Sequence, residues 1–272
     1  MKEQIAHYIN VLGKFCGKRD LEVLTGDCLQ RRFGICQADV MVLFGGSILQ
    51  GGDVLACGIK EQIAKKYVVV GGEGHTTETL RQRVRQEYPT LRTEGLSEAE
   101  IFQGYLSAVY GLQADYLETE STNCGNNITN LLALLEEKGI PFRSIILCQD
   151  ASMQRRMEAG LRKYVSDEVR IINYAAYEAE VAVKEGALAY SSESHGMWEM
   201  ERYVSLLMGE IPRLRDDENG YGPSGRDFIA HVEIPEEVRH AFEELKKRYG
   251  NHVREANPLY ASRGSADHRG SE

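Results

Sequence analysis

The sequence lacks any long hydrophobic run, and charged residues are scattered through its first twenty positions. A signal peptide or a membrane anchor needs a continuous apolar segment, so we expect neither, and we expect a cytoplasmic protein that does not bind membranes. Positive charge is also scarce, because 32 lysines and arginines stand against 41 acidic residues, for a net charge of −9. This balance argues against nucleic acid as a partner, since phosphate backbones attract basic surfaces.

Several common chemical motifs are missing as well. The chain has no GxGxxG dinucleotide fingerprint, no Walker phosphate-binding loop and no G-x-S-x-G elbow. Its six cysteines form no CxxC pair and show no metal-ligand spacing with the seven histidines, so we expect free thiols and no metal site. Cys124 precedes a predicted helix, where a thiolate is stabilised, but no basic residue is near it in the sequence. A structural role is the simpler interpretation of this cysteine.

What the sequence does contain is a series of apolar segments of strand length, each followed by a loop rich in glycine or polar residues and then by a helical pattern. The predicted strands are 39–44, 67–70, 115–118, 144–148 and 169–174. Such an alternation is typical of an α/β protein with a mostly parallel sheet of about five strands.

Four segments follow from the changes in pattern along the chain. They are an N-terminal helical segment (1–37), an α/β core (38–175), a small helical and irregular addition (176–250) and a polar tail that we expect to fray (251–272). Helical spacing over 3–16 predicts a helix covering one side of the sheet. Residues 177–194 show no strong period and predict a loop with partial helix. A helix from Met197 is expected to end at Gly209, because the charged, glycine-rich segment 210–229 looks unsuited to a helix interior.

The loops after the strands carry the candidate ligand-binding residues. In open α/β sheets the carboxyl ends of the strands border the ligand crevice, and the following helices direct N–H groups into it. Glycines let a ligand approach the backbone, amides bind polar edges, and an arginine pairs with an anion. The predicted ligand-binding residues are Gly45, Gly46, Gly71, Gly72, Ser121, Asn123, Asn127, Gln149 and Arg155. Helix capping is the competing interpretation, but the polar loop 121–127 is longer than a cap requires.

Three residues are candidate acid–base catalysts at the same edge. His75 follows the glycines after the second strand, and its alternative is a solvent-facing loop histidine. Glu98 is either a catalytic carboxylate or simply a favourable charge at a helix N-terminus. Asp150 follows the fourth strand and could hold a ribose or an amine.

Three stretches of the chain resemble the YdcF/SanA/ElyC family of domains of unknown function. They are STNCGNN (121–127), QDASMQRR (149–156) and MERYVSLLMGEIPRLRDDENGYGPSGRDFIAHVEIPEEV (200–238), and the resemblance extends over about 38–238. It implies a Rossmann-like three-layer α/β/α sandwich with a small C-terminal addition, and S-adenosylmethionine as a candidate ligand. The family's motif positions fall on Gly45, Gly71, Gly72, His75, Glu98, Ser121, Asn123, Asn127, Gln149, Asp150 and Arg155.

Two departures from the family limit what is carried over. Asn126 stands where the family commonly has Glu, which removes one carboxylate from any acid–base proposal. The chain also lacks the hydrophobic segment of the membrane-anchored SanA and ElyC, so we do not expect their envelope role.

Three functions remain open from the sequence. The first is a protein that binds S-adenosylmethionine or another adenosyl or nucleotide-like small molecule, with group transfer as its candidate activity. The second is a hydrolase or phosphoryl-handling enzyme that uses His75, Glu98 and Asp150 as acid–base groups and Arg155 or Arg156 to bind an anion. The third is a non-catalytic sensor or interaction module with 210–229 as its partner surface. The sequence predicts no particular protein partner.

Overall fold

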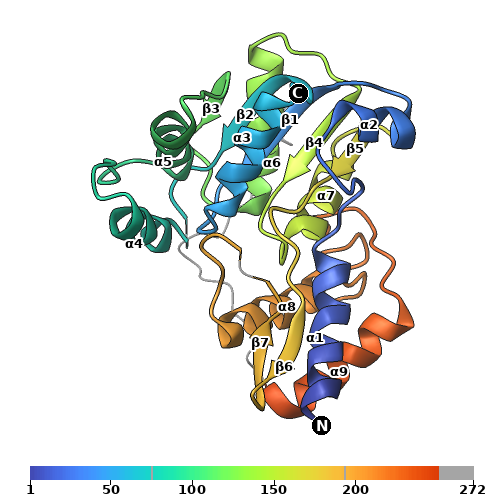
Figure 1. The fold of residues 1–272 in the computed structure, drawn as a ribbon. Coiled ribbons are helices and arrows are strands. Elements are labelled where there is room, and N and C mark those ends of the chain that lie inside the picture. The colour runs from blue at the N-terminus through green and yellow to red at the C-terminus, as the bar shows by residue number, and fades with distance from the viewer. Residues whose placement is uncertain (75, 193, 251–272) are drawn as a thin grey trace, which may run out of the picture.

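A five-stranded parallel sheet lies at the centre of the computed structural model, which describes residues 1–74, 76–192 and 194–250 (Figure 1). Its strands lie in the order β3-β2-β1-β4-β5. The strands are β1 (Ala38–Phe44), β2 (Ala64–Val70), β3 (Tyr116–Glu118), β4 (Ser144–Cys148) and β5 (Arg170–Asn173). All pairings within this sheet are parallel. The predicted α/β fold with about five parallel strands is therefore confirmed.

Helices cover both faces of the sheet and complete the three-layer sandwich (Figure 1). One face carries α3 (Gln50–Lys60), α4 (Thr77–Glu87) and α5 (Glu98–Tyr105), and the other carries α6 (Cys124–Glu137) and α7 (Gln154–Arg162). Side chains of β1 alternate between the two layers, since Val40 and Val42 pack with α6 and α7 while Met41 and Leu43 pack with α3 and α5. Burial on both faces explains why the strands read as continuous apolar runs.

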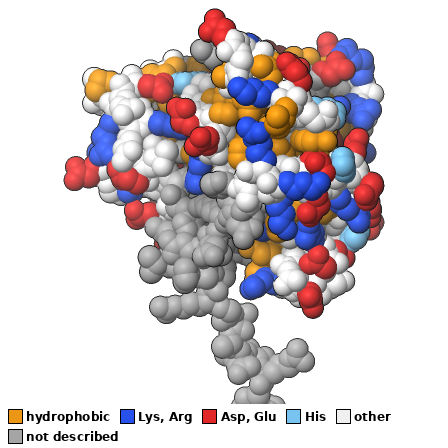
Figure 2. Space-filling view, turned by 90° about the horizontal axis from the view of Figure 1, so that it is seen from below, with side chains coloured by type: hydrophobic (Ala, Val, Ile, Leu, Met, Phe, Trp, Pro, Cys, Tyr) orange, Lys and Arg blue, Asp and Glu red, His pale blue; other side chains and the backbone are white. Residues whose placement is uncertain are grey.

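A further layer lies at the carboxyl ends of β4 and β5, below the sheet in Figure 1. It consists of α1 (Lys2–Cys16), the hairpin of β6 (Val181–Lys184) and β7 (Ala187–Tyr190), α8 (Met200–Leu214) and α9 (Glu236–Tyr249). The remaining short helices are α2 (Gly26–Phe33) and the π-helical turn η1 (Leu106–Tyr110), which continues α5. On the face seen in Figure 2, basic and acidic side chains of the described surface are interspersed rather than separated.

The predicted position of the first helix is wrong. α1 packs on α9, β6 and α8 instead of covering one side of the sheet. Gly13 allows the close contact with α8, because a Cβ at this position would lie 2.5 Å from the Tyr203 hydroxyl. The apolar stripe of α1 was visible in the sequence, but the stripe alone does not say which partner buries it.

Residues 181–190, within the segment predicted to be a loop with partial helix, form a strand hairpin. Glu185 and Gly186 both have positive φ, as the tight turns of two-residue hairpins require. The first strand is held by Asn10 of α1, whose side chain donates to the Val181 carbonyl at 2.9 Å and accepts from the Val181 N–H at 2.8 Å. A side chain 171 residues away thus completes the edge of this hairpin.

α8 continues past the expected stop at Gly209, through Pro212, to Leu214. Proline cannot donate a backbone hydrogen bond, so this helix loses one bond at that position. Ile211 and Leu214 are both only 1% exposed, and Glu210 forms a two-point ion pair with Arg156 of α7 at 2.5 and 2.9 Å. These buried contacts offset the missing hydrogen bond.

Within the described part of the chain, no helix is both long and apolar enough to cross a membrane. The predicted tail 251–272 lies outside the described residues.

Replacing Glu210 with Gln should destabilise the protein by about 3 kcal/mol, because it leaves the Arg156 guanidinium buried without a counter-charge. The measurement is urea denaturation followed by circular dichroism. Glu137→Gln is the matched control, since Glu137 and its partner Lys138 are 69% and 40% exposed, and an exposed pair is worth about 0–1 kcal/mol. Equal effects of the two substitutions would contradict the structural role of the buried pair.

Candidate functional site

The strand order creates a switch point between β1 and β4. The chain leaves β1 toward β2 and β3 on one side, and then crosses back to β4 and β5 on the other. In open α/β sheets such a point is where a ligand crevice forms. The two bordering loops are the turn 45–49 and the loop 149–153. They are in contact, since a Cβ built on Gly46 has the Gln149 Oε1 atom as its nearest neighbour at 3.6 Å.

Gly45 and Gly71 lie against the side chain of Glu98. A Cβ on Gly45 would be 2.5 Å from Glu98 Oε2, and one on Gly71 would be 3.0 Å from Glu98 Cβ. The N–H groups of Glu98 and Ala99 donate to the carbonyls of Gly72 and Gly71, at 3.0 and 2.8 Å. The first turn of α5 is thus docked on the backbone after β2, which requires glycine there.

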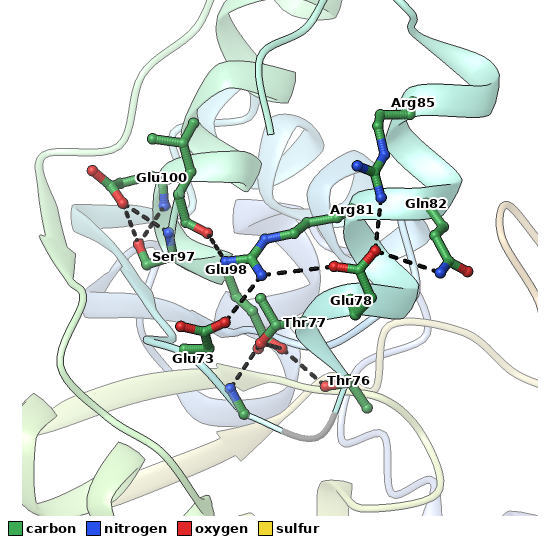
Figure 3. A network of polar contacts seen from close by, with 12 residues as sticks. Glu73, Thr76, Thr77, Glu78, Arg81, Gln82, Arg85, Ser97, Glu98 and Glu100 are labelled. Atoms are coloured by element: carbon green, nitrogen blue, oxygen red, sulfur yellow. Dashed lines mark hydrogen bonds and ion pairs between the residues drawn. The ribbon is translucent and has the colours of Figure 1, made fainter. Parts of the chain in front are cut away.

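The Glu98 carboxyl group is buried, with 7% of the residue exposed. Its Oε1 atom accepts hydrogen bonds from the Thr76 and Thr77 hydroxyls at 2.9 Å each (Figure 3). Burial raises the pKa of Glu98, and the two threonine hydrogen bonds and the charge of Arg81 oppose this increase only in part. Such a group holds its proton to higher pH than an exposed glutamate and is suited to bind a hydroxyl or an amine.

Gly72 joins the second strand to the third loop. Its N–H donates to the Ser121 carbonyl at 3.0 Å, and a Cβ here would lie 2.6 Å from the Thr119 carbonyl oxygen. The loop is held from beneath by Glu118, whose Oε1 atom accepts from the Ser121 N–H at 2.9 Å. The other carboxylate oxygen of Glu118 is buried without a hydrogen-bond partner among the described residues. The sequence analysis missed Glu118, although an acidic residue ending a buried strand was a usable signal.

Asn123 serves as the N-cap of α6, since its Oδ1 atom accepts from the Asn126 N–H at 3.0 Å. Asn127 lies in the first turn of that helix and is 9% exposed. For Asn123 the capping interpretation is therefore the one that the geometry supports. Cys124 is the first residue of α6, so the polar loop is shorter than the sequence suggested.

Gln149 belongs to a buried amide network beneath the fourth loop. Its N–H donates to Gln154 Oε1 at 2.9 Å, and Gln154 in turn donates to the Leu147 carbonyl and to Asn173 Oδ1. Gln149 Oε1 accepts from the neighbouring Asp150 N–H at 2.6 Å. These bonds orient Gln149 toward the turn after β1.

Asp150 is buried and its carboxylate accepts four hydrogen bonds. Oδ1 accepts from the Ser152 N–H at 2.9 Å, the Ser152 hydroxyl at 2.7 Å and the Tyr177 hydroxyl at 2.8 Å. Oδ2 accepts from Trp198 Nε1 at 2.7 Å. The group is therefore occupied by structural donors and is poorly placed to take a proton from a substrate.

The two arginines of α7 point away from the switch point. The Arg155 guanidinium stacks on the Phe15 ring at 4.2 Å and donates to the Phe15 carbonyl, which ties α7 to the end of α1. Arg156 is engaged by Glu210. Arg155, which was predicted to bind an anion, therefore contacts α1 rather than the switch point. His75 lies outside the described residues.

Ser47 is a residue that the sequence analysis did not select. It follows Gly45 and Gly46 in the turn after β1 and is 1% exposed, and its hydroxyl has no hydrogen-bond partner among the described residues. Its carbonyl accepts from Arg83 Nη1 at 2.5 Å. A buried unpaired hydroxyl costs about 1–3 kcal/mol, so this position calls for a polar partner.

A cavity of about 470 Å³ lies beside this site, between α3 and the segment after β5. Its wall includes Gln50, Asp53 and Cys57 of α3, together with Tyr174 and Arg19. None of the predicted site residues that the structure describes lines it. Among the described residues, no group of three or more His, Cys, Asp or Glu side chains is arranged to hold a metal ion. No protein-family model matches the chain, and the resemblance noted in the sequence stays a prediction.

Gly72→Ala should destabilise the fold by about 1–3 kcal/mol, because the added methyl group meets backbone carbonyls that cannot move away. Gly104→Ala in α5 is the control, since a Cβ there meets no atom within 4 Å and alanine favours a helix. Thermal denaturation of both variants measures the difference. A Gly72 variant as stable as the Gly104 variant would show that the loop can relax.

The stability of the wild-type protein should fall as pH rises through the pKa of Glu98. A carboxyl group whose pKa is raised on folding contributes stability fully below its unfolded pKa, and this contribution is lost above the folded pKa. Glu98→Gln, which keeps an oxygen for Thr76 and Thr77, should flatten this dependence. The measurement is urea denaturation across about pH 4 to 8, with Glu100→Gln as a control that must retain the wild-type slope above the pKa of Glu100.

Proposed function

We propose that the protein binds S-adenosylmethionine or another adenosyl or nucleotide-like molecule at the carboxyl edge of the sheet, in the cytoplasm, and transfers a group from it. The observation that carries the proposal is the turn after β1. There, Gly46 and the Ser47 hydroxyl, which has no hydrogen-bond partner in the described part of the chain, lie at the switch point beside Gln149.

The backbone at Gly46 supports the approach of a ligand. Among the described residues, a Cβ at this position meets only Gln149 Oε1 within 4 Å, at 3.6 Å, so the neighbourhood is less crowded than at Gly45 or Gly72. Hydrogen bonding from a ligand to Ser47 would remove the cost of its unpaired hydroxyl. Gln149 offers an amide to the same region, and amides bind the polar edges of a purine or a ribose.

Buried carboxyl groups favour a cationic ligand at this edge. Glu118 borders the third loop, and Asp150 borders the fourth. The sulfonium of S-adenosylmethionine carries a positive charge, which a carboxylate attracts strongly at a buried site. The Oε1 atom of Glu98 accepts from the Thr76 and Thr77 hydroxyls, so Oε2 is the group we assign to a ribose hydroxyl or an amine. Methyl transfer then depends mainly on alignment of the reactants.

The alternative of a hydrolase has less support. It needs Asp150 as an acid–base group, but four donors occupy this carboxylate. It also needs Arg155 or Arg156 as an anion clamp, and these bind Phe15 and Glu210. The segment 210–229 has internal contacts of its own, since Asp216 accepts from the Ser224 N–H at 2.6 Å and pairs with His231. These contacts favour a folded loop over a partner surface.

Titration calorimetry with S-adenosylmethionine, S-adenosylhomocysteine and ATP tests the proposal. Gly46→Ala should weaken binding at least about tenfold, because the methyl group occupies the ligand's path without a clash in the fold. Ser192→Ala is the control, since Ser192 lines the neighbouring 470 Å³ cavity and should leave the affinity unchanged.

Two results would count against the proposal. One is that none of these compounds, at about millimolar concentration, raises the thermal midpoint of the protein. The other is that Ser192→Ala weakens binding and Gly46→Ala does not, which would place the ligand in the cavity instead.

A further inference from the structure

The residues 194–198, which we call the strap, connect β7 to α8 and cross both loops of the switch point. The His195 carbonyl accepts from the Gln50 N–H at 3.1 Å, next to the turn after β1, and Trp198 donates to Asp150 in the loop after β4. A Cβ on Gly196 would lie 3.2 Å from the Leu49 nitrogen. The strap therefore spans the two loops between which the ligand is proposed to bind.

Arg83 of α4 fastens the strap to the turn after β1. One guanidinium nitrogen donates both to the Ser47 carbonyl and to the Gly196 carbonyl, and another lies 3.4 Å from the Met197 carbonyl. The guanidinium also lies over the Trp198 ring, 4.9 Å from its centroid. One side chain thus links the strap directly to Ser47, whose buried hydroxyl has no partner among the residues that the structure describes.

His195 fastens the strap to α3 and α4 through two carboxylates. Its Nδ1 atom is 2.9 Å from Asp53 Oδ2, and its Nε2 atom is 2.6 Å from Glu87 Oε2. An imidazole can donate to two acceptors at once only when both nitrogens are protonated. The arrangement is therefore that of an imidazolium between two negative charges.

Asp53, which faces His195, is held in place by two tyrosine hydroxyls. Its Oδ1 atom accepts from the Tyr105 hydroxyl and, at 2.8 Å, from the Tyr110 hydroxyl. The Tyr105 oxygen is also 3.4 Å from His195 Nδ1, and the Tyr88 ring packs on the imidazole. Hydrogen bonds to Glu87 and Asp53 raise the pKa of His195, although partial burial opposes this.

We propose that the strap is a pH-sensitive cover of the switch point, latched by the His195 imidazolium between Asp53 and Glu87 and released when that imidazolium loses a proton. The identity of the covered ligand rests on the proposed function, whereas the pH-dependent release of the strap does not. A neutral imidazole leaves one nitrogen as an acceptor facing a carboxylate, so one of the two contacts turns unfavourable. The latch holds below the raised pKa of His195 and opens as pH increases through it.

Hydrogen–deuterium exchange of the full chain tests the latch without any ligand. After correction for the intrinsic pH dependence of exchange, protection of the amides of the strap in the wild type should fall about tenfold or more between about pH 6 and pH 9. His195→Gln should show low protection that no longer depends on pH. Glu87→Gln, which changes a 40% exposed side chain and keeps the fold intact, should lower protection in the same direction.

His231→Gln is the matched control. His231 also pairs with a carboxylate, Asp216, at 2.6 Å, but it lies outside the strap, and the variant should keep the wild-type pH dependence of the strap. Wild-type protection that does not change with pH, or equal effects of the His195 and His231 variants, would overturn the proposal.

Stopped-flow binding of S-adenosylmethionine distinguishes a failure of the strap proposal from a failure of the ligand proposal. Association should accelerate with pH in the wild type and should be fast at all pH values in His195→Gln. If the strap opens with pH and S-adenosylmethionine does not bind, the proposed ligand is wrong and the latch is retained. If the ligand binds at the same rate in both proteins at every pH, the strap is not a cover.

Discussion

The carboxylate of Asp150 holds the C-terminal layer to the carboxyl edge of the sheet. Burying an ionised carboxylate is unfavourable unless donors satisfy it, and here Ser152, Tyr177 and Trp198 supply four hydrogen bonds. Tyr177 follows β5 and Trp198 precedes α8, so two segments far apart in sequence meet at the end of β4. The positions of the hairpin, of α8 and of the strap all depend on this meeting point.

Packing at the carboxyl edge of the sheet also determines which of its polar groups are available to a ligand. Gly45, Gly71 and Gly72 are needed mainly so that α5 and the third loop can pack closely on the strand ends. The arginines of α7 bind α1 and α8. What is left for a ligand is a smaller set around Gly46, Ser47, Gln149 and the second oxygen of Glu98. This set lies beneath a segment held largely by hydrogen bonds and ion pairs, which are contacts that respond to pH and salt.

The candidate residues could be assigned to one edge of the sheet because they lie where parallel strands end. The sequence assigned these residues to one edge of the sheet but did not show which of them are neighbours. In the structure, Gly71 lies beside Glu98, Gly72 beside Ser121 and Gly46 beside Gln149. Ser47 and His195 were missed, because a single serine or histidine has no periodic pattern around it. Arg155 was assigned to an anion because nothing in its neighbourhood revealed that Phe15, 140 residues earlier, would bind it.

By itself the sequence determined the five strands, the helices between them and the edge at which polar loops gather. These follow from burial repeated at regular spacing, which neighbouring residues record. Tertiary structure alone decided that α1 packs on the C-terminal layer, that 181–190 forms a hairpin held by Asn10, and that α8 continues through Pro212. It also decided which buried carboxylates are paired. The reason is physical: each of these outcomes depends on contacts between residues distant along the chain, and their energies exceed the local preferences that a sequence pattern expresses.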